Sequence, residues 1–385
     1  MYKSFTRTAA LVVLATGFLA AANVGAAVPT APGWYALPNT KLRSVCAAEH
    51  GFPQVEGAVG CRGITYAWSG GAFDSRRNRL IIFGGGHNDY YGNEIYAVNI
   101  GNASVQRLTD PGLPIATSCV ESIAGGTQPN SRHTYDGVEY IASVDKLFVF
   151  GGSLACAGGY HGGDTWTFDF GTMRWQNMQP SGPQPQKEVG ILTAYDPNTG
   201  LVFLHDRRFL FSYNPSTNAY TQLTTQNAYL GYHMAATIDP VRKKFVIVGY
   251  NSGQGRGSVY SYDITPGGSY AYSEVSTSGA TGAVGAYYPG LAFDPTTNKI
   301  VAWTENQPNT VYSLDIGTRQ WTSVSFSGGP APTGNGTHGR WQYSAASGVF
   351  VLANKVDDDV MVFRAGSAPP PDTIPPGQVQ GVRLQ

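Results

Sequence analysis

The chain has 385 residues, of which only 13% are charged, and Lys and Arg balance Asp and Glu to a formal net charge of zero. A neutral chain argues against nucleic acid as a partner, because that binding draws on clustered Lys and Arg. Gly numbers 49 and aromatic residues make up 12% of the chain, a mix that disfavours helices and favours short strands joined by tight turns. The composition therefore predicts an all-β protein.

The N-terminus has the parts of a secretory signal peptide. Lys3 and Arg7 precede an uncharged apolar run over residues 9–22, and the small residues 25–27 offer a cleavage site before Val28. We therefore expect residues 1–27 to be a signal peptide and the mature protein to be secreted or periplasmic. No later segment approaches the ~18 apolar residues of a membrane helix, so we expect no membrane span.

One pattern recurs six times: an apolar strand, a turn rich in Asp, Pro, Asn or Ser, and a second apolar strand. The copies begin at Ala72, Tyr140, Ala194, Thr237, Ala292 and Gln342, mostly 43 to 55 residues apart. Repeats of this period are typical of propeller blades. The repeat predicts a six-bladed β-propeller over residues 28–365.

The last blade lacks a strand that the N-terminus can supply. A third apolar strand follows every copy and a fourth follows the first five, but the sixth copy runs from Arg364 into a Pro-rich stretch. The segment GWYALPN, starting at Gly33, looks like an outer strand without the other three. If it pairs with the last blade, it closes the ring and protects the sheet edges.

Several glycines and aromatic residues mark a resemblance to a known family. Gly84, Gly85 and Gly86, the pair Gly151 and Gly152, an aromatic residue in nearly every third strand, and Trp175 and Trp321 resemble kelch repeats, as in galactose oxidase and its relatives. The resemblance spans roughly residues 33–365 and implies a kelch-type propeller. Propeller polysaccharide lyases of similar build often have seven blades, so seven is the alternative count. Propellers host many functions, so the resemblance implies little about chemistry.

The C-terminal segment 366–385 has a different composition. Its Pro cluster is typical of an extended linker, and the letters DTIPPGQVQGVRL resemble the opening strand of a fibronectin type III module. We interpret it as a linker followed by the start of a truncated module.

The four cysteines are expected to form disulfides. An even number of cysteines in an exported chain is typical of a disulfide framework. Cys46 and Cys61 are close in sequence, and so are Cys119 and Cys156. We expect these two bridges, with the other two connectivities open.

The histidines concentrate on one rim of the predicted propeller. Loops that enter the blades and loops that join second and third strands share this rim, whereas the Asp-Pro turns lie on the other. Six of the seven histidines fall in such loops or at the starts of inner strands: His87, His133, His161, His205, His233 and His338. Because mouths of repeat architectures are common binding surfaces, we expect the functional site on this rim.

Our leading hypothesis is a polysaccharide lyase that cleaves a uronic acid polymer by β-elimination, as secreted propellers of similar build do. Such a reaction needs a base, an acid and a cation beside the substrate carboxylate. The predicted catalytic residues are His133, Tyr232 and His233 for proton transfer and Arg340 for the carboxylate, with Arg208 as its alternative. The predicted substrate-binding residues are His87, Tyr90, Arg208, Tyr287 and His338. These side chains should converge at the channel mouth.

Two other functions fit the sequence. Tyr232 and His233, with His338 downstream, resemble the ligands of galactose oxidase-like copper-radical enzymes, which also need a cysteine linked to a second Tyr. The other is a non-catalytic module that binds a glycan or a protein. Histidines from different blades leave a divalent metal at the channel mouth open. We expect the partner to be an acidic polysaccharide or another glycan, and the protein to be a monomer.

Overall fold

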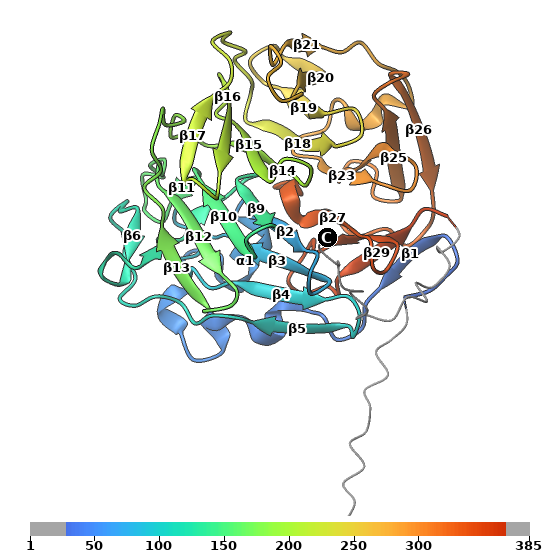
Figure 1. The fold of residues 1–385 in the computed structure, drawn as a ribbon. Helices are drawn as coiled ribbons and strands as arrows, with labels where there is room; N and C mark the ends of the chain where they lie inside the picture. Colours follow the sequence, from blue (N-terminus) through green and yellow to red (C-terminus); the bar gives the residue numbers. More distant parts are fainter. Residues whose placement is uncertain (1–27, 367–385) are drawn as a thin grey trace, which may run out of the picture.

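The computed structural model describes residues 28–366 and shows six antiparallel sheets around one central axis (Figure 1). Neighbouring inner strands contact one another in a ring that runs β2, β9, β14, β18, β23, β27 and back to β2. The six-bladed all-β propeller is therefore confirmed, and the seven-bladed alternative is wrong. The predicted signal peptide, and the linker and module start beyond residue 366, lie outside the described residues.

From the axis outward, each of the first three blades has four strands in chain order. Blade 1 has β2 (Gly70–Asp74), β3 (Arg79–Phe83), β4 (Tyr96–Asn99) and β5 (Ser104–Arg107). Blade 2 has β9 (Val138–Ile141), β10 (Lys146–Phe150), β12 (Thr165–Asp169) and β13 (Arg174–Asn177). Blade 3 has β14 (Leu192–Asp196), β15 (Leu201–His205), β16 (Leu210–Asn214) and β17 (Ala219–Gln222).

The other three blades follow the same plan with two additions. Blade 4 has β18 (His233–Asp239), β19 (Lys244–Asn251), β20 (Arg256–Asp263) and β21 (Tyr272–Glu274). Blade 5 has β23 (Gly290–Asp294), β24 (Lys299–Trp303), β25 (Thr310–Asp315) and β26 (Gln320–Ser325), and β22 (Ser278–Gly279) pairs in parallel with β26. Blade 6 has β27 (Trp341–Ser344), β28 (Val349–Leu352), β29 (Met361–Arg364) and, outermost, β1 (Gly33–Ala36).

The pairing of β1 with β29 closes the ring, as the sequence predicts. The register sets Gly33 opposite Arg364 and Trp34 opposite Phe363. Trp34 is 7% exposed and packs against Trp303 of blade 5 and Trp341 of blade 6. Because β1 covers the edge of β29 and also fills the core between two blades, the ring depends on this strand.

The blades are apolar on both faces, because each packs against two neighbours. In β3, Leu80 and Ile82 belong to the cluster shared with blade 6, whereas Ile81 belongs to the cluster shared with blade 2. A strand buried on both faces reads as a continuous apolar run, as in RLIIF.

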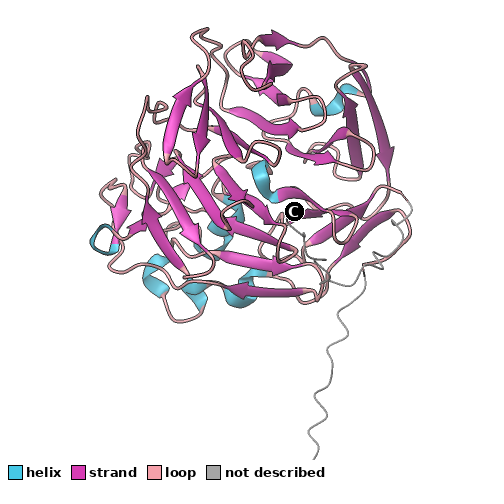
Figure 2. Ribbon diagram, in the orientation of Figure 1, coloured by secondary structure: helices cyan, strands magenta, loops and turns pink. Residues whose placement is uncertain are grey.

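Short helices and two small ribbons lie outside the blades. Figure 2 shows most of the helices gathered beside blade 1, where η1 packs on β5. The helices are η1 (Leu42–Val45), η2 (Ala47–Glu49), η3 (Pro53–Val55), η4 (Gly60–Arg62), α1 (Gly63–Tyr66), η5 (Ala124–Gly126), η6 (Thr281–Ala283) and η7 (His338–Arg340). The ribbons are β6 (Ser122–Ile123) with β7 (Gln128–Pro129), and β8 (Arg132–His133) with β11 (Ser153–Leu154).

Both predicted disulfides are present. Cys46 is bonded to Cys61, and Cys119 to Cys156. The first joins two of the short helical segments beside blade 1, and the second ties a loop before blade 2 to the loop after β10. The bridges are compatible with an extracellular protein.

Candidate functional site

Each blade has one residue at an equivalent position, ten residues before the turn that follows its inner strand. The turn between the first two strands of each blade contains a residue with positive φ: Asn78, Asp145, Gly200, Lys243, Asn298 and Gly348. Ten residues before these positions stand Trp68, Tyr135, Gly190, His233, Tyr288 and His338, which we call the mouth ring. Because the inner strands surround the axis, the mouth ring surrounds one end of the channel.

The backbone of the mouth ring is strained. Trp68, Tyr135, Tyr288 and His338 have φ between 45° and 51°, in the left-handed region. This conformation costs an L-residue with a bulky side chain about 1–2 kcal/mol. Left-handed bulky residues collect at functional sites, where the surrounding structure holds them in place.

Side chains of the mouth ring meet across the axis. The Tyr135 ring of blade 2 lies 6.3 Å from the Tyr288 ring of blade 5 and 5.6 Å from the His338 ring of blade 6, centroid to centroid. Tyr288 in turn lies 4.8 Å from His338 and 4.8 Å from His233. Blades 2 and 5 are opposite in a six-bladed ring, so these contacts close the channel at this end.

Imidazole and carboxylate groups extend the site over blade 1 and blade 2. His133 packs 5.0 Å from Trp68 and 5.7 Å from His87. Its Nε2 lies 2.8 Å from a carboxylate oxygen of Asp89. Burial lowers the pKa of His133, and the hydrogen bond to Asp89 opposes that shift.

Tyrosines and a guanidinium extend the site on the other side, over blades 3 to 5. Tyr232 and Tyr287 flank His233 at 4.1 Å and 4.5 Å, and both are well exposed, at 37% and 51%. The Arg207 guanidinium lies 5.6 Å from the centre of the Tyr232 ring and pairs with Glu188 at 3.0 Å.

Gly190 is the one member of the mouth ring without a side chain, and Tyr232 occupies the space. Gly190 has φ +68°, and a Cβ there would overlap Tyr232, approaching its Cα at 2.7 Å. The glycine thus lets Tyr232 lie against the ring between His233 and Arg207.

Burial sets the protonation states of the site at neutral pH. Burial, and secondarily the charge of Arg207, lowers the pKa of His233 to about 4, so its imidazole is neutral near pH 7. Burial also lowers the pKa of His338 well below its usual value and raises the pKa of Tyr135 and Tyr288, which therefore stay protonated. Neutral imidazoles that accept protons stand beside phenols that donate them.

Of the predicted site residues, the structure brings His87, His133, Tyr232, His233, Tyr287 and His338 together through these contacts. Arg208 lies at the margin: its guanidinium is 5.6 Å from the ring of Tyr229, which also stacks with Arg207. His205, which the sequence places on this rim, is instead fully buried, with Nε2 2.8 Å from the Tyr262 hydroxyl.

Arg340 does not face a substrate carboxylate. It is fully buried and donates hydrogen bonds to backbone carbonyls of Ser69, Gly336, Ala353 and Asn354. Burial lowers the pKa of Arg340 to about 10. The sequence predicted a carboxylate-binding Arg340 because it follows His338 by two residues. That prediction is wrong, because the short helix η7 directs the two side chains to different surroundings. Arg340 is a positioning residue that ties three loops of the rim together.

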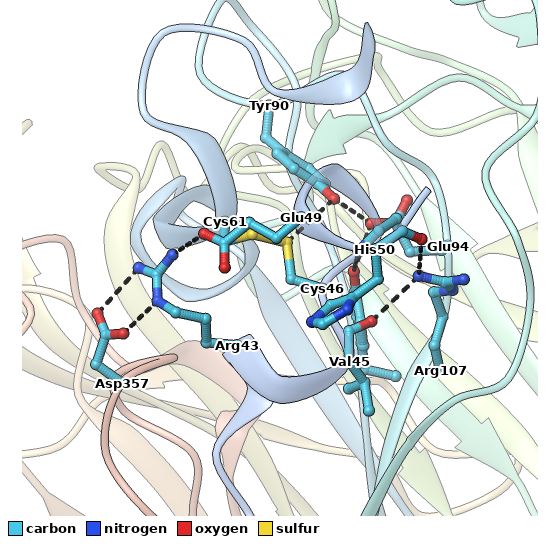
Figure 3. Close-up of a disulfide and its surroundings, with 12 residues drawn as sticks. Arg43, Val45, Cys46, Glu49, His50, Cys61, Tyr90, Glu94, Arg107 and Asp357 are labelled. Atoms are coloured by element: carbon cyan, nitrogen blue, oxygen red, sulfur yellow. Dashed lines mark hydrogen bonds and ion pairs between the residues drawn. A yellow bond between two sulfur atoms is a disulfide. The ribbon is translucent and has the colours of Figure 1, made fainter. Parts of the chain in front are cut away.

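Tyr90 is also away from the mouth. It is 1% exposed, and its hydroxyl donates to Glu94 and lies 3.8 Å from the Cys46 sulfur, as Figure 3 shows. Burial raises the pKa of Glu94, whose other carboxyl oxygen has no partner among the described residues. Tyr90 belongs to the core between blade 1 and the helical segment, because the loop from His87 turns inward there.

Sequence reasoning did not assign Trp68, Tyr135 or Arg207 to the site. A signal for the first two was present, because both stand ten residues before a turn residue of their blade, as His233, Tyr288 and His338 do. Arg207 was distinguishable from Arg208 only by its side-chain direction, which sequence does not give.

A polar cavity lies in the channel beneath the mouth ring. It measures about 180 Å³ and reaches the turns at Pro197 and Pro240 on the opposite rim. Asp136 and Glu139 line it, and burial raises their pKa to about 7 and about 8.

In residues 28–366, no three His, Cys, Asp or Glu side chains cluster so as to hold a metal ion.

The copper-radical alternative needs a free cysteine that can bond to a tyrosine, and the structure contradicts it. Both disulfides use the chain's four cysteines, which all lie in described residues, so none is free for a thioether bond to tyrosine.

No described helix is long and apolar enough to cross a membrane.

No family model matches the chain, and no curated protein matches it. A solved structure that resembles it is a structural genomics protein of unknown function from Bacteroides thetaiotaomicron, with a TM-score of 0.51 and 11% sequence identity over 87% of this chain and 76% of that one. At this identity the likeness supports the propeller fold alone, so the function must be argued from the mouth ring.

Proposed function

We propose that the mouth ring binds an acidic polysaccharide and cleaves it by β-elimination. The observation that carries the proposal is the neutral His233 imidazole, set between exposed Tyr232 and Tyr287 and close to Arg207. A base, phenolic acids and a cation are the groups that this reaction needs at one point.

In the proposed reaction, His233 removes the proton from the carbon next to the substrate carboxylate. The electron pair of that C–H bond forms a carbon–carbon double bond, and the bond to the glycosidic oxygen on the next carbon breaks. Tyr232 or Tyr287 donates a proton to that oxygen. The His233 Nδ1 is buried and has no hydrogen-bond partner among the described residues, so we assign the proton acceptance to Nε2.

We assign the substrate carboxylate to Arg208, because the donors of Arg207 are already used. Arg207 is 7% exposed and already donates to Leu230, Glu188 and Tyr229. The Arg208 guanidinium forms no ion pair within residues 28–366 and is half-buried. A guanidinium without a partner can pair with a carboxylate and stabilise the enolate charge that develops on it.

The test is incubation of the purified protein with pectin, alginate and ulvan, followed by the ultraviolet absorbance of unsaturated products. We expect product from one polymer, and His233→Ala should lower turnover by roughly 10²–10⁴, the usual weight of one general base. His50→Ala is the matched control, since His50 is exposed and outside the mouth ring.

Binding without catalysis is the second candidate, because the exposed faces of Tyr232 and Tyr287 suit stacking on a sugar ring. Calorimetric titration with the same polymers separates the two. Binding with no product favours the binding module, and neither binding nor product refutes both.

A further inference from the structure

A second cavity lies on the same rim, beside the mouth ring. It measures about 360 Å³ and lies between α1, the loop 332–335 and the loop after β28. Its lining includes Arg62, Thr65, Tyr66, Thr333, Lys355 and Asp357. We call it the side pocket.

The side pocket carries two cations without ion-pair partners. Neither Arg62 nor Lys355 pairs with a carboxylate in the part of the chain that the structure describes. The Asp357 carboxylate accepts from Arg43 at both oxygens, and Arg43 also pairs with Glu49, as Figure 3 shows. With two cations and one carboxylate in its lining, the pocket keeps a net positive charge. The Arg62 guanidinium lies 4.2 Å from the centre of the Tyr66 ring. The pocket therefore offers positive charge beside an aromatic ring.

Hydrogen bonds fix the walls of the side pocket. The Glu305 carboxylate accepts from the backbone of Thr333 and Gly334, both at 2.8 Å. The Asn335 amide donates to the Tyr66 carbonyl at 2.8 Å. Arg340 donates to the Asn354 carbonyl at 3.2 Å and so fixes the backbone next to Lys355. Walls held in this way lose little freedom when a ligand binds.

One wall of the side pocket packs against the mouth ring. Tyr66 precedes Trp68 by two residues, and Thr337 donates its backbone N–H to the Tyr288 carbonyl at 3.0 Å. A Cβ on Gly336 would overlap the Tyr288 side chain. The loop that forms one wall of the pocket thus packs directly on the mouth ring.

We infer that the side pocket is a second subsite, which binds an anionic sugar residue of the polymer held at the mouth ring. This inference rests on the proposed function. Arg62 and Lys355 supply the contacts to a carboxylate or a sulfate ester, and Tyr66 supplies a stacking face. The chemistry is shared by uronate and sulfated sugars, and the test separates them.

The test measures binding by calorimetry in the His233→Ala protein, where turnover should be slowed roughly 10²–10⁴-fold. The probes are hexagalacturonate, digalacturonate, sulfated maltohexaose and maltohexaose. The double variant Arg62→Gln/Lys355→Gln should weaken hexagalacturonate binding about tenfold, equivalent to about 1.4 kcal/mol. Digalacturonate, which fills only the mouth, should bind unchanged. The matched control is Arg174→Gln/Lys243→Gln, two exposed cations far from the mouth ring.

With the active protein, the pocket variant should raise KM for long substrate and leave kcat unchanged. If it loses affinity for sulfated maltohexaose and not for hexagalacturonate, the anion is a sulfate ester. Equal affinities of the pocket and control variants for both acidic probes overturn the subsite while the mouth function stands. If neither acidic probe binds the starting protein, the proposed function and the subsite fail together.

Discussion

The two rims of the propeller use the same backbone conformation for different side chains. In the turns between the first two strands of each blade, left-handed positions are held by Asn78, Asp145, Gly200, Lys243, Asn298 and Gly348, and all but Lys243 are types that tolerate positive φ. At the mouth ring, four of the six equivalent positions are left-handed with Trp, Tyr or His side chains. The inner turns thus mostly hold residues that tolerate this conformation, whereas the mouth ring retains bulky rings in spite of strain.

Polar groups differ between the rims in the same way. On the turn rim, Arg242 pairs with Asp239 at 2.9 Å and with Asp315 at 3.0 Å, and Asp239 also caps its own turn. At the mouth ring, His338 is 1% exposed, and neither ring nitrogen has a hydrogen-bond partner among the described residues. Buried polar groups are usually satisfied. The contrast teaches that the mouth ring combines left-handed bulky residues with an unsatisfied buried imidazole at the place where we propose the ligand binds.

The largest expected effect comes from Arg340, the buried guanidinium that holds the mouth rim together. Arg340→Ala removes the donors to four carbonyls and leaves a cavity, so the free energy of unfolding in urea should fall by about 3 kcal/mol or more. Arg174→Ala, an exposed arginine without an ion pair among the described residues, should change it by less than about 0.5 kcal/mol. Equal effects of the two variants would show that Arg340 is not the tie between the rim loops.

Gly190→Ala tests whether Tyr232 keeps its position only because residue 190 has no side chain. The new Cβ would overlap Tyr232, and φ is +68°, so we expect a loss of about 1–3 kcal/mol and weaker saccharide binding. Gly255→Ala has nearly the same φ, +66°, but no atom within 4 Å of its Cβ, so it should show only the backbone cost. If both variants bind saccharide as well as the parent, Tyr232 is not held by Gly190.

The channel carboxyls between the two rims predict a pH dependence of stability. Burial raises the folded-state pKa of Asp136 to about 7, so its contribution is fully present below its unfolded value and is lost as pH rises through about 7. The free energy of unfolding should therefore fall between about pH 4 and pH 8, and Asp136→Asn should reduce that fall by about 1 kcal/mol or more. Asp358→Asn, at an exposed site, is the control. A pH profile identical to that of the parent would contradict the burial of a protonated carboxyl.

The smallest effect, that of Lys243→Gly, tests the comparison of the rims itself, with Tyr135→Gly as its counterpart at the mouth. Lys243 has φ +53° and is exposed on the turn rim, so Lys243→Gly should raise the free energy of unfolding by about 0.5–1 kcal/mol. Tyr135 has nearly the same φ, 51°, but is buried among rings, so Tyr135→Gly should lower stability by about 2–4 kcal/mol. The same sign at both positions would mean that left-handed strain does not distinguish the rims.

The sequence by itself determined the architecture, because the information is local and repeated. Each blade carries its own strand–turn–strand pattern, so six copies predict six blades, and the orphan strand at Trp34 predicts the closure. Cys46 and Cys61, and Cys119 and Cys156, are near in the chain, so their pairing was the expected one of three, and the structure confirms it. The gathering of His133, His233 and His338 on one rim also follows, since strand polarity decides which loops share a rim.

Only the tertiary structure decided which loop side chains face the mouth. Tyr90 and Arg340 stand in rim loops yet point into the core, whereas Trp68 and Tyr135 reach the axis because left-handed backbone turns them there. The direction of a loop side chain depends on the sign of φ and on packing by neighbouring blades. The ten-residue spacing to the inner turns marks Trp68 and Tyr135 as rim positions, but it gives neither the sign of φ nor the packing. The rim could therefore be predicted and its chemistry could not.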